Sequence, residues 1–246
     1  MTDLSAALSQ LPPETRDGIT LFVKSVSEAL GTDLVSVILY GSAARSDFCS
    51  GESDVNLLLV LRTIDVAQMQ KLMPVFDKSL RLGISPMLLT PDELKCSADA
   101  FAGKFFSMRE ERKVLYGIDI LENVSIPAEA LRLRCEQEIR NMLLRLRRGY
   151  LSQRGRDLPR LLWSMGRHTR DIVRVALALT QDGILPRERA LEAASVRFGF
   201  DARPVQEVEG LRSNDCLTPE AAEALFSRFL SAIAIITDAI DRLVIR

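Results

Sequence analysis

Gly41-Ser42, directly after an apolar run, is the first feature of this chain whose residue types are suited to chemistry. A glycine lets the backbone come close to a bound phosphate. Backbone N–H groups and a serine hydroxyl at the start of a helix can hold anionic oxygens. The pair therefore predicts a phosphate-binding turn.

Asp54-Val55-Asn56, at the start of the next apolar run, is the second such feature. Alternate residues of a strand point to the same face, so Asp54 and Asn56 can offer oxygen ligands to one metal ion. Magnesium prefers oxygen ligands and usually keeps waters and substrate phosphates in its shell. Together, the turn and the triplet predict a site for a magnesium-bound polyphosphate.

Strands are expected on both sides of these residues. The runs 34–40 and 55–61 are almost wholly apolar and rich in β-branched residues, which is typical of buried strands. A third strand is expected at 84–89, where Pro86 favours a sheet edge or a bulge because proline has no N–H for the ladder. A short fourth strand is expected at 113–116.

Helices are expected between these strands and throughout the rest of the chain. Apolar residues at helical spacing follow Pro13 and end at Gly31, and Thr90-Pro91-Asp92-Glu93 has the pattern of a capping box. After about residue 125 the strand signals stop. The helical segments of that part are expected at 127–154, 158–181, 186–198, 202–212 and 218–243.

The motif resembles the signature of the polymerase-β-like nucleotidyltransferases, which is a Gly-Ser pair, a loop and then Asp-hydrophobic-Asp. The matching residues are Gly41-Ser42-Ala43-Ala44-Arg45 and Ser53-Asp54-Val55-Asn56. The order of elements is similar to that of the bacterial aminoglycoside nucleotidyltransferases. The resemblance implies an α+β fold, with a nucleotidyltransferase-type mixed sheet and helices at 1–120 and a C-terminal α-helical bundle at 121–246.

The resemblance also implies roles for the matching residues. Gly41, Ser42, Arg45 and Ser53 would bind the nucleotide, and Asp54 and Asn56 would be the metal ligands and catalytic residues. The partners would be a nucleoside triphosphate and a hydroxyl acceptor on a small molecule or a protein, and the cofactor of an active enzyme would be Mg²⁺.

Two departures from the family pattern leave a second interpretation open. Asn56 stands where the family has a second aspartate, and the strand expected at 84–89 has no acid to supply the usual third carboxylate. Asp92 and Glu93 follow that strand in the capping box and are expected to serve the helix. The alternative is therefore a catalytically inactive nucleotidyltransferase-fold module with a binding or regulatory role. Glu136 and Glu138 are guesses for the base of an active enzyme.

Composition limits the other function classes. The net charge of −1 excludes bulk attraction to nucleic acid, and no stretch of about twenty apolar residues predicts a membrane span. The N-terminus lacks the pattern of a signal peptide. The four cysteines are not spaced as zinc ligands, so free thiols and a cytoplasmic location are expected. The cysteines are Cys49, Cys96, Cys135 and Cys216.

Arginine is concentrated in the first two helices expected in the bundle. Residues 132–174 contain twelve arginines and four acidic residues. Most of these arginines are expected to form a solvated face that pairs with acids, and a basic wall facing the Gly41-Ser42 turn is the alternative. The single histidine, His168, falls on the expected apolar seam, so a packing role is predicted for it.

Overall fold

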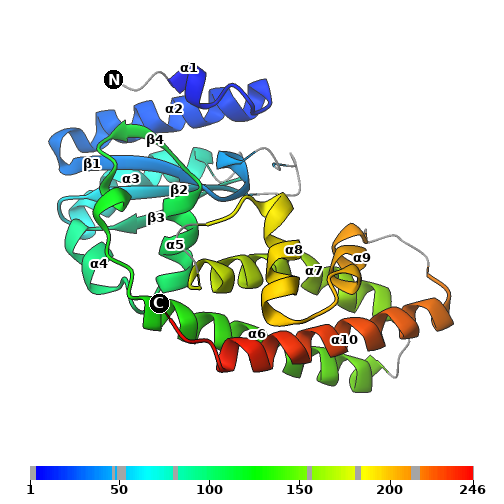
Figure 1. The fold of residues 1–246 in the computed structure, drawn as a ribbon. Helices are drawn as coiled ribbons and strands as arrows, with labels where there is room; N and C mark the ends of the chain where they lie inside the picture. The colour runs from blue at the N-terminus through cyan, green and yellow to red at the C-terminus, as the bar shows by residue number, and fades with distance from the viewer. Residues whose placement is uncertain are drawn as a thin grey trace. The chain divides into compact units, whose positions relative to one another are not determined.

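The computed structural model describes residues 4–45, 48, 54–79, 83–153, 157–180, 184–211 and 217–245. The chain divides into two compact units, Met1–Ile126 and Pro127–Arg246. The first unit holds a sheet with helices, and the described part of the second is helical (Figure 1).

The first unit is built on a mixed four-stranded sheet in the order β3-β2-β1-β4. Both neighbours of β1 run antiparallel to it, and β3 runs parallel to β2. The expected strands are confirmed, with the fourth one residue longer at each end, and Pro86 lies in an edge strand as predicted. The strands are β1 (Leu34–Tyr40), β2 (Val55–Leu61), β3 (Ile84–Leu89) and β4 (Arg112–Gly117).

Helices cover both faces of this sheet, so its central strands are buried on both sides (Figure 1). Val37 and Leu39 pack in one core cluster together with Phe22 of α2, whereas Ile38 belongs to a second cluster that contains Phe105 of α5. This alternation follows from the period of two in a strand. The helices of this unit are α1 (Leu4–Ala7), α2 (Pro13–Leu30), α3 (Val66–Ser79), α4 (Pro91–Cys96) and α5 (Ala102–Glu110).

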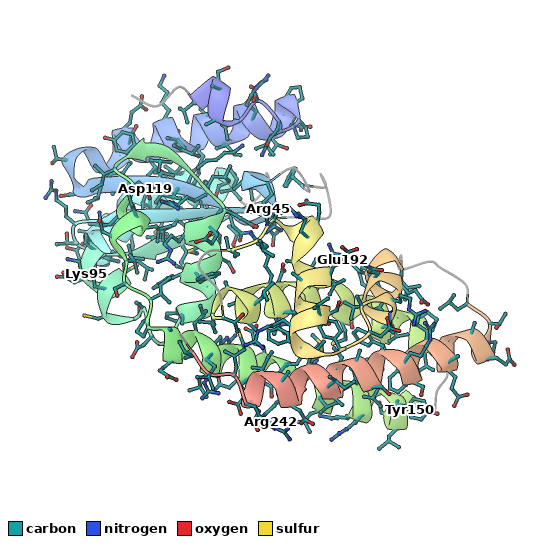
Figure 2. All side chains as sticks on the ribbon, in the orientation of Figure 1. Arg45, Lys95, Asp119, Tyr150, Glu192 and Arg242 are labelled. Atoms are coloured by element: carbon teal, nitrogen blue, oxygen red, sulfur yellow. The ribbon has the colours of Figure 1, made fainter. Side chains whose placement is uncertain are left out.

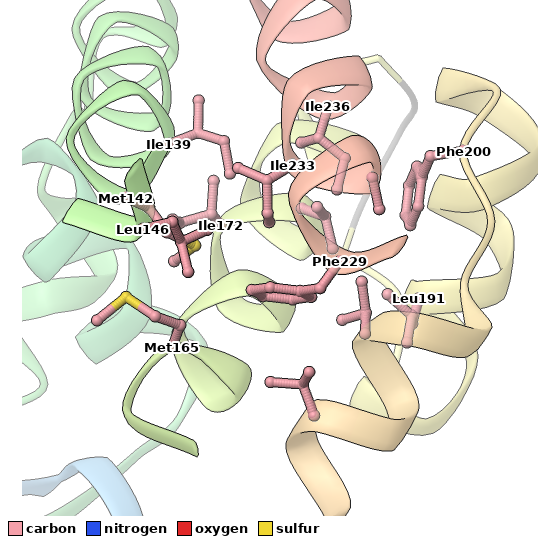
Figure 3. Packing of buried hydrophobic residues seen from close by; sticks show 14 of the residues in the cluster. Ile139, Met142, Leu146, Met165, Ile172, Leu191, Phe200, Phe229, Ile233 and Ile236 are labelled. Carbon is pink, nitrogen blue, oxygen red and sulfur yellow. The ribbon is translucent and has the colours of Figure 1, made fainter. Parts of the chain in front are cut away.

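The second unit packs its helices around one hydrophobic core (Figure 3). Phe229 and Ile233 of the last helix lie in this core with Met142 and Ile172, and all four side chains are buried. The helices are α6 (Ala128–Gln153), α7 (Leu158–Ala178), α8 (Arg187–Phe198), α9 (Arg203–Gly210) and α10 (Pro219–Asp241). The helical segments expected from the sequence are confirmed, with small differences at their ends.

The buried face of α7 differs from the predicted seam. His168 is 54% exposed and its Nε2 lies 3.7 Å from a carboxylate oxygen of Glu138, so the predicted packing role is wrong. Thr169 is buried in its place. Its hydroxyl donates to the carbonyl of Met165 at 3.1 Å and contacts the sulfur of Met142 at 3.2 Å, so the helix itself satisfies the buried hydroxyl.

Several arginines of the second unit pair with acids, although the partners of Arg132 and Arg134 on α6 are near neighbours and not the acids elsewhere in the chain that the solvated-face interpretation expected. Glu136 accepts from Arg132 at 3.1 Å and from Arg140 at 2.9 Å, and Arg134 pairs with Glu138 at 2.7 Å. These pairs are four residues apart on α6, where side chains are neighbours.

The cysteines covered by the structure are free thiols. Cys96 is exposed and Cys135 is buried. Burial raises the pKa of Cys135 to about 12. Cys49 and Cys216 lie outside the described residues. No helix within the described ranges is long and apolar enough to span a membrane.

Candidate functional site

The sheet brings the two halves of the sequence motif together at one end. Tyr40, the last residue of β1, is the ladder partner of Asn56 on β2. The turn that follows Tyr40 therefore lies beside the first residues of β2. A Cβ atom placed on Gly41 would be only 3.3 Å from the Nδ2 of Asn56, so the glycine allows this close approach.

Gly41 also needs to be glycine for its backbone conformation. Its φ of 76° lies in the left-handed region, which other residues rarely adopt. Gly41–Ala44 forms a 3-10 turn, in which the N–H of Arg45 donates to the carbonyl of Ser42 at 3.0 Å. The predicted strand, turn and strand order is thus present, with Ser42 partly exposed on the turn.

Asp54 and Asn56 lie at the start of β2, next to this turn. Asp54 is exposed, and its carboxylate has no hydrogen bond or ion pair within the described part of the chain. The Nδ2 of Asn56 donates to the backbone carbonyl of Asp54 at 3.4 Å. The carboxylate of Asp54 is therefore accessible to a ligand. Ser53, the other predicted nucleotide contact of this segment, lies outside the described residues.

The neighbour of Asn56 on the other side is Ser85. The two residues are partners in the parallel pairing of β2 with β3, so their side chains project from the same face of the sheet. The β3 position beside Asn56 thus carries a neutral hydroxyl. Across the described ranges, no three His, Cys, Asp or Glu side chains are grouped closely enough to hold a metal ion.

Glu93, the second of the two acids that follow β3, is engaged as the capping-box pattern predicted. A carboxylate oxygen of Glu93 accepts from the N–H of Thr90 at 2.7 Å, and the Thr90 hydroxyl accepts from the N–H of Glu93 at 3.1 Å. Glu93 therefore serves the start of α4.

Two side chains outside the motif hold the turn. The Nε2 of Gln10 donates to the carbonyls of Ala44 at 3.1 Å and Arg45 at 2.8 Å. The guanidinium of Arg45, at the end of the turn (Figure 2), donates to Glu111 at 2.6 Å. Sequence reasoning missed Gln10 and Glu111. Glu111 directly precedes β4, so the pairing of β4 with β1 would have indicated it, whereas no sequence signal indicated Gln10.

Comparison with known proteins gives a structural neighbour and no sequence match. No protein-family model matches the chain, and no curated protein matches it. A similar solved structure is that of spectinomycin adenyltransferase AAD(9) from Enterococcus faecialis, with ATP and spectinomycin. The TM-score is 0.54 at 14% sequence identity, over 89% of this chain and 98% of the adenyltransferase. This chain has the fold of an aminoglycoside nucleotidyltransferase.

Within this nucleotidyltransferase fold, the two acids guessed as a base are already paired. Glu136 accepts from two arginines, and Glu138 pairs with Arg134 on the same helix. The ion pairs therefore engage both carboxylates with arginines of α6 itself. The carboxylate of Asp54, in contrast, has no ion pair with any residue that the structure describes.

Proposed function

We propose that this chain binds a nucleoside triphosphate at the end of the sheet formed by Gly41, Ser42, Asp54 and Asn56, and transfers its nucleotidyl group to a hydroxyl. The supporting observation is the position of the glycine-serine turn directly beside the start of β2, with an accessible carboxylate at Asp54. The structural neighbour was crystallised with ATP, which supports a nucleotide ligand for this fold.

In this proposal, the turn holds the phosphates. Backbone N–H groups of the Gly41–Ala44 turn and the Ser42 hydroxyl are donors suited to phosphate oxygens. The absence of a side chain at Gly41 lets a phosphate approach the backbone. During transfer, the acceptor oxygen bonds to the α-phosphorus, the bond from that phosphorus to pyrophosphate breaks, and the hydroxyl proton passes to solvent water.

The residues present fit one magnesium ion that arrives with the nucleotide. Asp54 would supply a carboxylate and Asn56 an amide oxygen, which are hard oxygen donors. With a single formal negative charge, this pair depends on waters and phosphate oxygens to complete the coordination of the metal. When bound, Mg²⁺ would neutralise the negative charge that develops on the phosphates during transfer.

A non-catalytic nucleotide-binding module is the second candidate. It is favoured by the neutral side chains of Asn56 and Ser85, which lie in register beside each other. A site with few carboxylates can retain a nucleotide while it stabilises the transition state poorly.

A binding and transfer experiment separates these two candidates. ATP, GTP, CTP and UTP are titrated calorimetrically with and without Mg²⁺ against the native chain and Asp54→Ala, and pyrophosphate release is then followed with a panel of hydroxyl compounds and proteins. Magnesium-dependent binding that is lost in Asp54→Ala, with pyrophosphate release, is the expected result. Binding without release supports the module, and failure of the native chain to bind any triphosphate overturns both.

A further inference from the structure

The Gly41–Ala44 turn is fixed at its end by side chains from two other segments of the first unit. We propose that Gln10 and Glu111 are positioning residues, which hold this turn in the conformation that receives the phosphates of the nucleotide. The inference rests on the proposed nucleotide site. Neither residue belongs to the motif, and each acts through Ala44 or Arg45 at the end of the turn.

Gln10 bonds to the turn from a segment that is itself anchored. Leu8 and Leu11, on either side of it, are buried in the core cluster of the first unit. The Nζ of Lys113 on β4 donates to the carbonyl of Ala7 at 2.9 Å, which ties the same segment to the sheet. The amide of Gln10 therefore joins two consecutive carbonyls of the turn to a fixed point.

Glu111 directly precedes β4 and accepts a hydrogen bond from Arg45, the residue that follows the turn. Its neighbour Arg112 is the ladder partner of Tyr40, so the register of β4 sets the position of Glu111 beside the residues that follow β1. The Arg45 and Glu111 side chains are 25% and 14% exposed. A charge-assisted hydrogen bond of 2.6 Å in such a partly buried position strongly restricts the end of the turn.

These contacts leave the turn ready to receive an anion. Gln10 binds carbonyl oxygens of the turn, and Glu111 binds a side chain, so neither contact uses the backbone N–H groups of Gly41 and Ser42. A donor set that is fixed before the ligand arrives costs less ordering entropy on binding. In this proposal Arg45 also acts through the turn, because its guanidinium is engaged by Glu111.

The test compares Gln10→Ala, Gln10→Glu and Glu111→Gln with the native chain. Magnesium-ATP affinity is measured by calorimetry, adenosine affinity by ligand-observed NMR, and thermal stability by circular dichroism. We expect ATP binding to weaken about threefold to tenfold in Gln10→Ala, because neutral hydrogen bonds that hold the turn are lost. A larger loss is expected in Gln10→Glu, because its carboxylate has no N–H and faces two carbonyls. Adenosine affinity is expected to stay unchanged in all three.

The chain offers a matched control for each residue. The Nε2 of Gln68 donates to a carboxylate oxygen of Asp33 at 2.7 Å. Asp33 directly precedes β1, at the end of the strand opposite to the turn, so Gln68→Ala removes a glutamine contact away from the site. Glu209 pairs with Arg170 in the second unit with similar exposure, so Glu209→Gln is the control for Glu111→Gln. Both controls are expected to bind ATP as the native chain does.

The possible failures can be told apart. If the native chain binds no nucleoside triphosphate, the proposed function fails. If the native chain binds ATP and the Gln10 and Glu111 variants bind it equally well, the positioning role is wrong. Equal losses of ATP and adenosine affinity with a lowered melting temperature would also overturn it, because they indicate a general structural role.

Discussion

Replacing Gly41 by alanine tests the geometry of the candidate site directly. The φ of 76° lies in the left-handed region, where a residue with a Cβ loses about 1–2 kcal/mol relative to glycine. The new Cβ would also lie 3.3 Å from the Nδ2 of Asn56, so this side chain has to shift by a few tenths of an ångström. We therefore expect Gly41→Ala to lower the free energy of unfolding by about 1–2 kcal/mol.

Gly199 supplies a control that isolates the crowding from the backbone strain. Its φ is 74°, almost the same as that of Gly41, but apart from its chain neighbours no described residue has a heavy atom within 4 Å of the position of its missing Cβ. Gly199→Ala is therefore expected to lose a similar amount of stability without any displacement of a neighbour. It lies after α8, in the helical unit.

The assays are urea unfolding followed by circular dichroism, and calorimetric titration with magnesium-ATP. Stability should fall in both variants, whereas ATP affinity should fall only in Gly41→Ala, by about tenfold or more, because small displacements of binding groups have large effects. An unchanged stability of Gly41→Ala would show that the turn has another conformation. Equal ATP affinities of both variants would refute the link between Gly41, Asn56 and the nucleotide.

Three further predictions concern charge and burial. Asn56→Asp combined with Ser85→Glu places three carboxylates with Asp54 at one end of the sheet, so the variant should be less stable than the native chain in EDTA. Added Mg²⁺ should raise the melting temperature of this variant, and the variant should release pyrophosphate faster than the native chain. A melting temperature that does not change with Mg²⁺ would contradict this prediction. Burial raises the pKa of the Cys135 thiol to about 12, so this thiol should not react with iodoacetamide at pH 8 until the chain unfolds. Peptide mass mapping of the alkylated protein measures this. The hydrogen bonds from Arg228 lower the pKa of Glu207, so Glu207→Gln should cost less than about 1 kcal/mol at pH 7, since the pair is about half exposed. That contribution is complete above the ordinary pKa of 4.5 and is lost as the pH falls below it, so urea midpoints of the native chain and variant should converge in acid.

The two central strands, β1 and β2, were predictable from the sequence because they are buried on both faces. The runs that form β1 and β2 are almost wholly apolar, and such runs indicate central strands with few alternatives. The family resemblance assigned Gly41 and Asn56 to one site, whereas the pairing that brings them to the same end of the sheet was found in the structure. The ion pairs of α6 were equally readable, since Glu136 has arginines four residues away on each side.

The errors and omissions arise where tertiary contacts decide between equivalent local patterns. On α7, steps of three and four residues fit a seam through His168 or through Thr169. Thr169 is the buried residue, and its hydroxyl contacts the sulfur of Met142 on α6, while the carbonyl of Met165 satisfies its hydrogen bond. Gln10 and Glu111 come close to the turn only when segments far from it in the sequence pack beside β1. Spacing within the sequence therefore cannot indicate their contacts with the turn.

In the proposed site, the charge of the described residues favours binding of metal and nucleotide as one complex. Arg45 pairs with Glu111, Asn56 and Ser85 are neutral, and the exposed carboxylate of Asp54 has no partner within the described part of the chain. A single exposed carboxylate in water holds a divalent ion weakly, because the attraction is screened and the ion gives up hydration reluctantly. Triphosphate oxygens have to supply the remaining negative charge. Magnesium alone should therefore bind this chain poorly, whereas the magnesium–nucleotide complex should bind as one ligand.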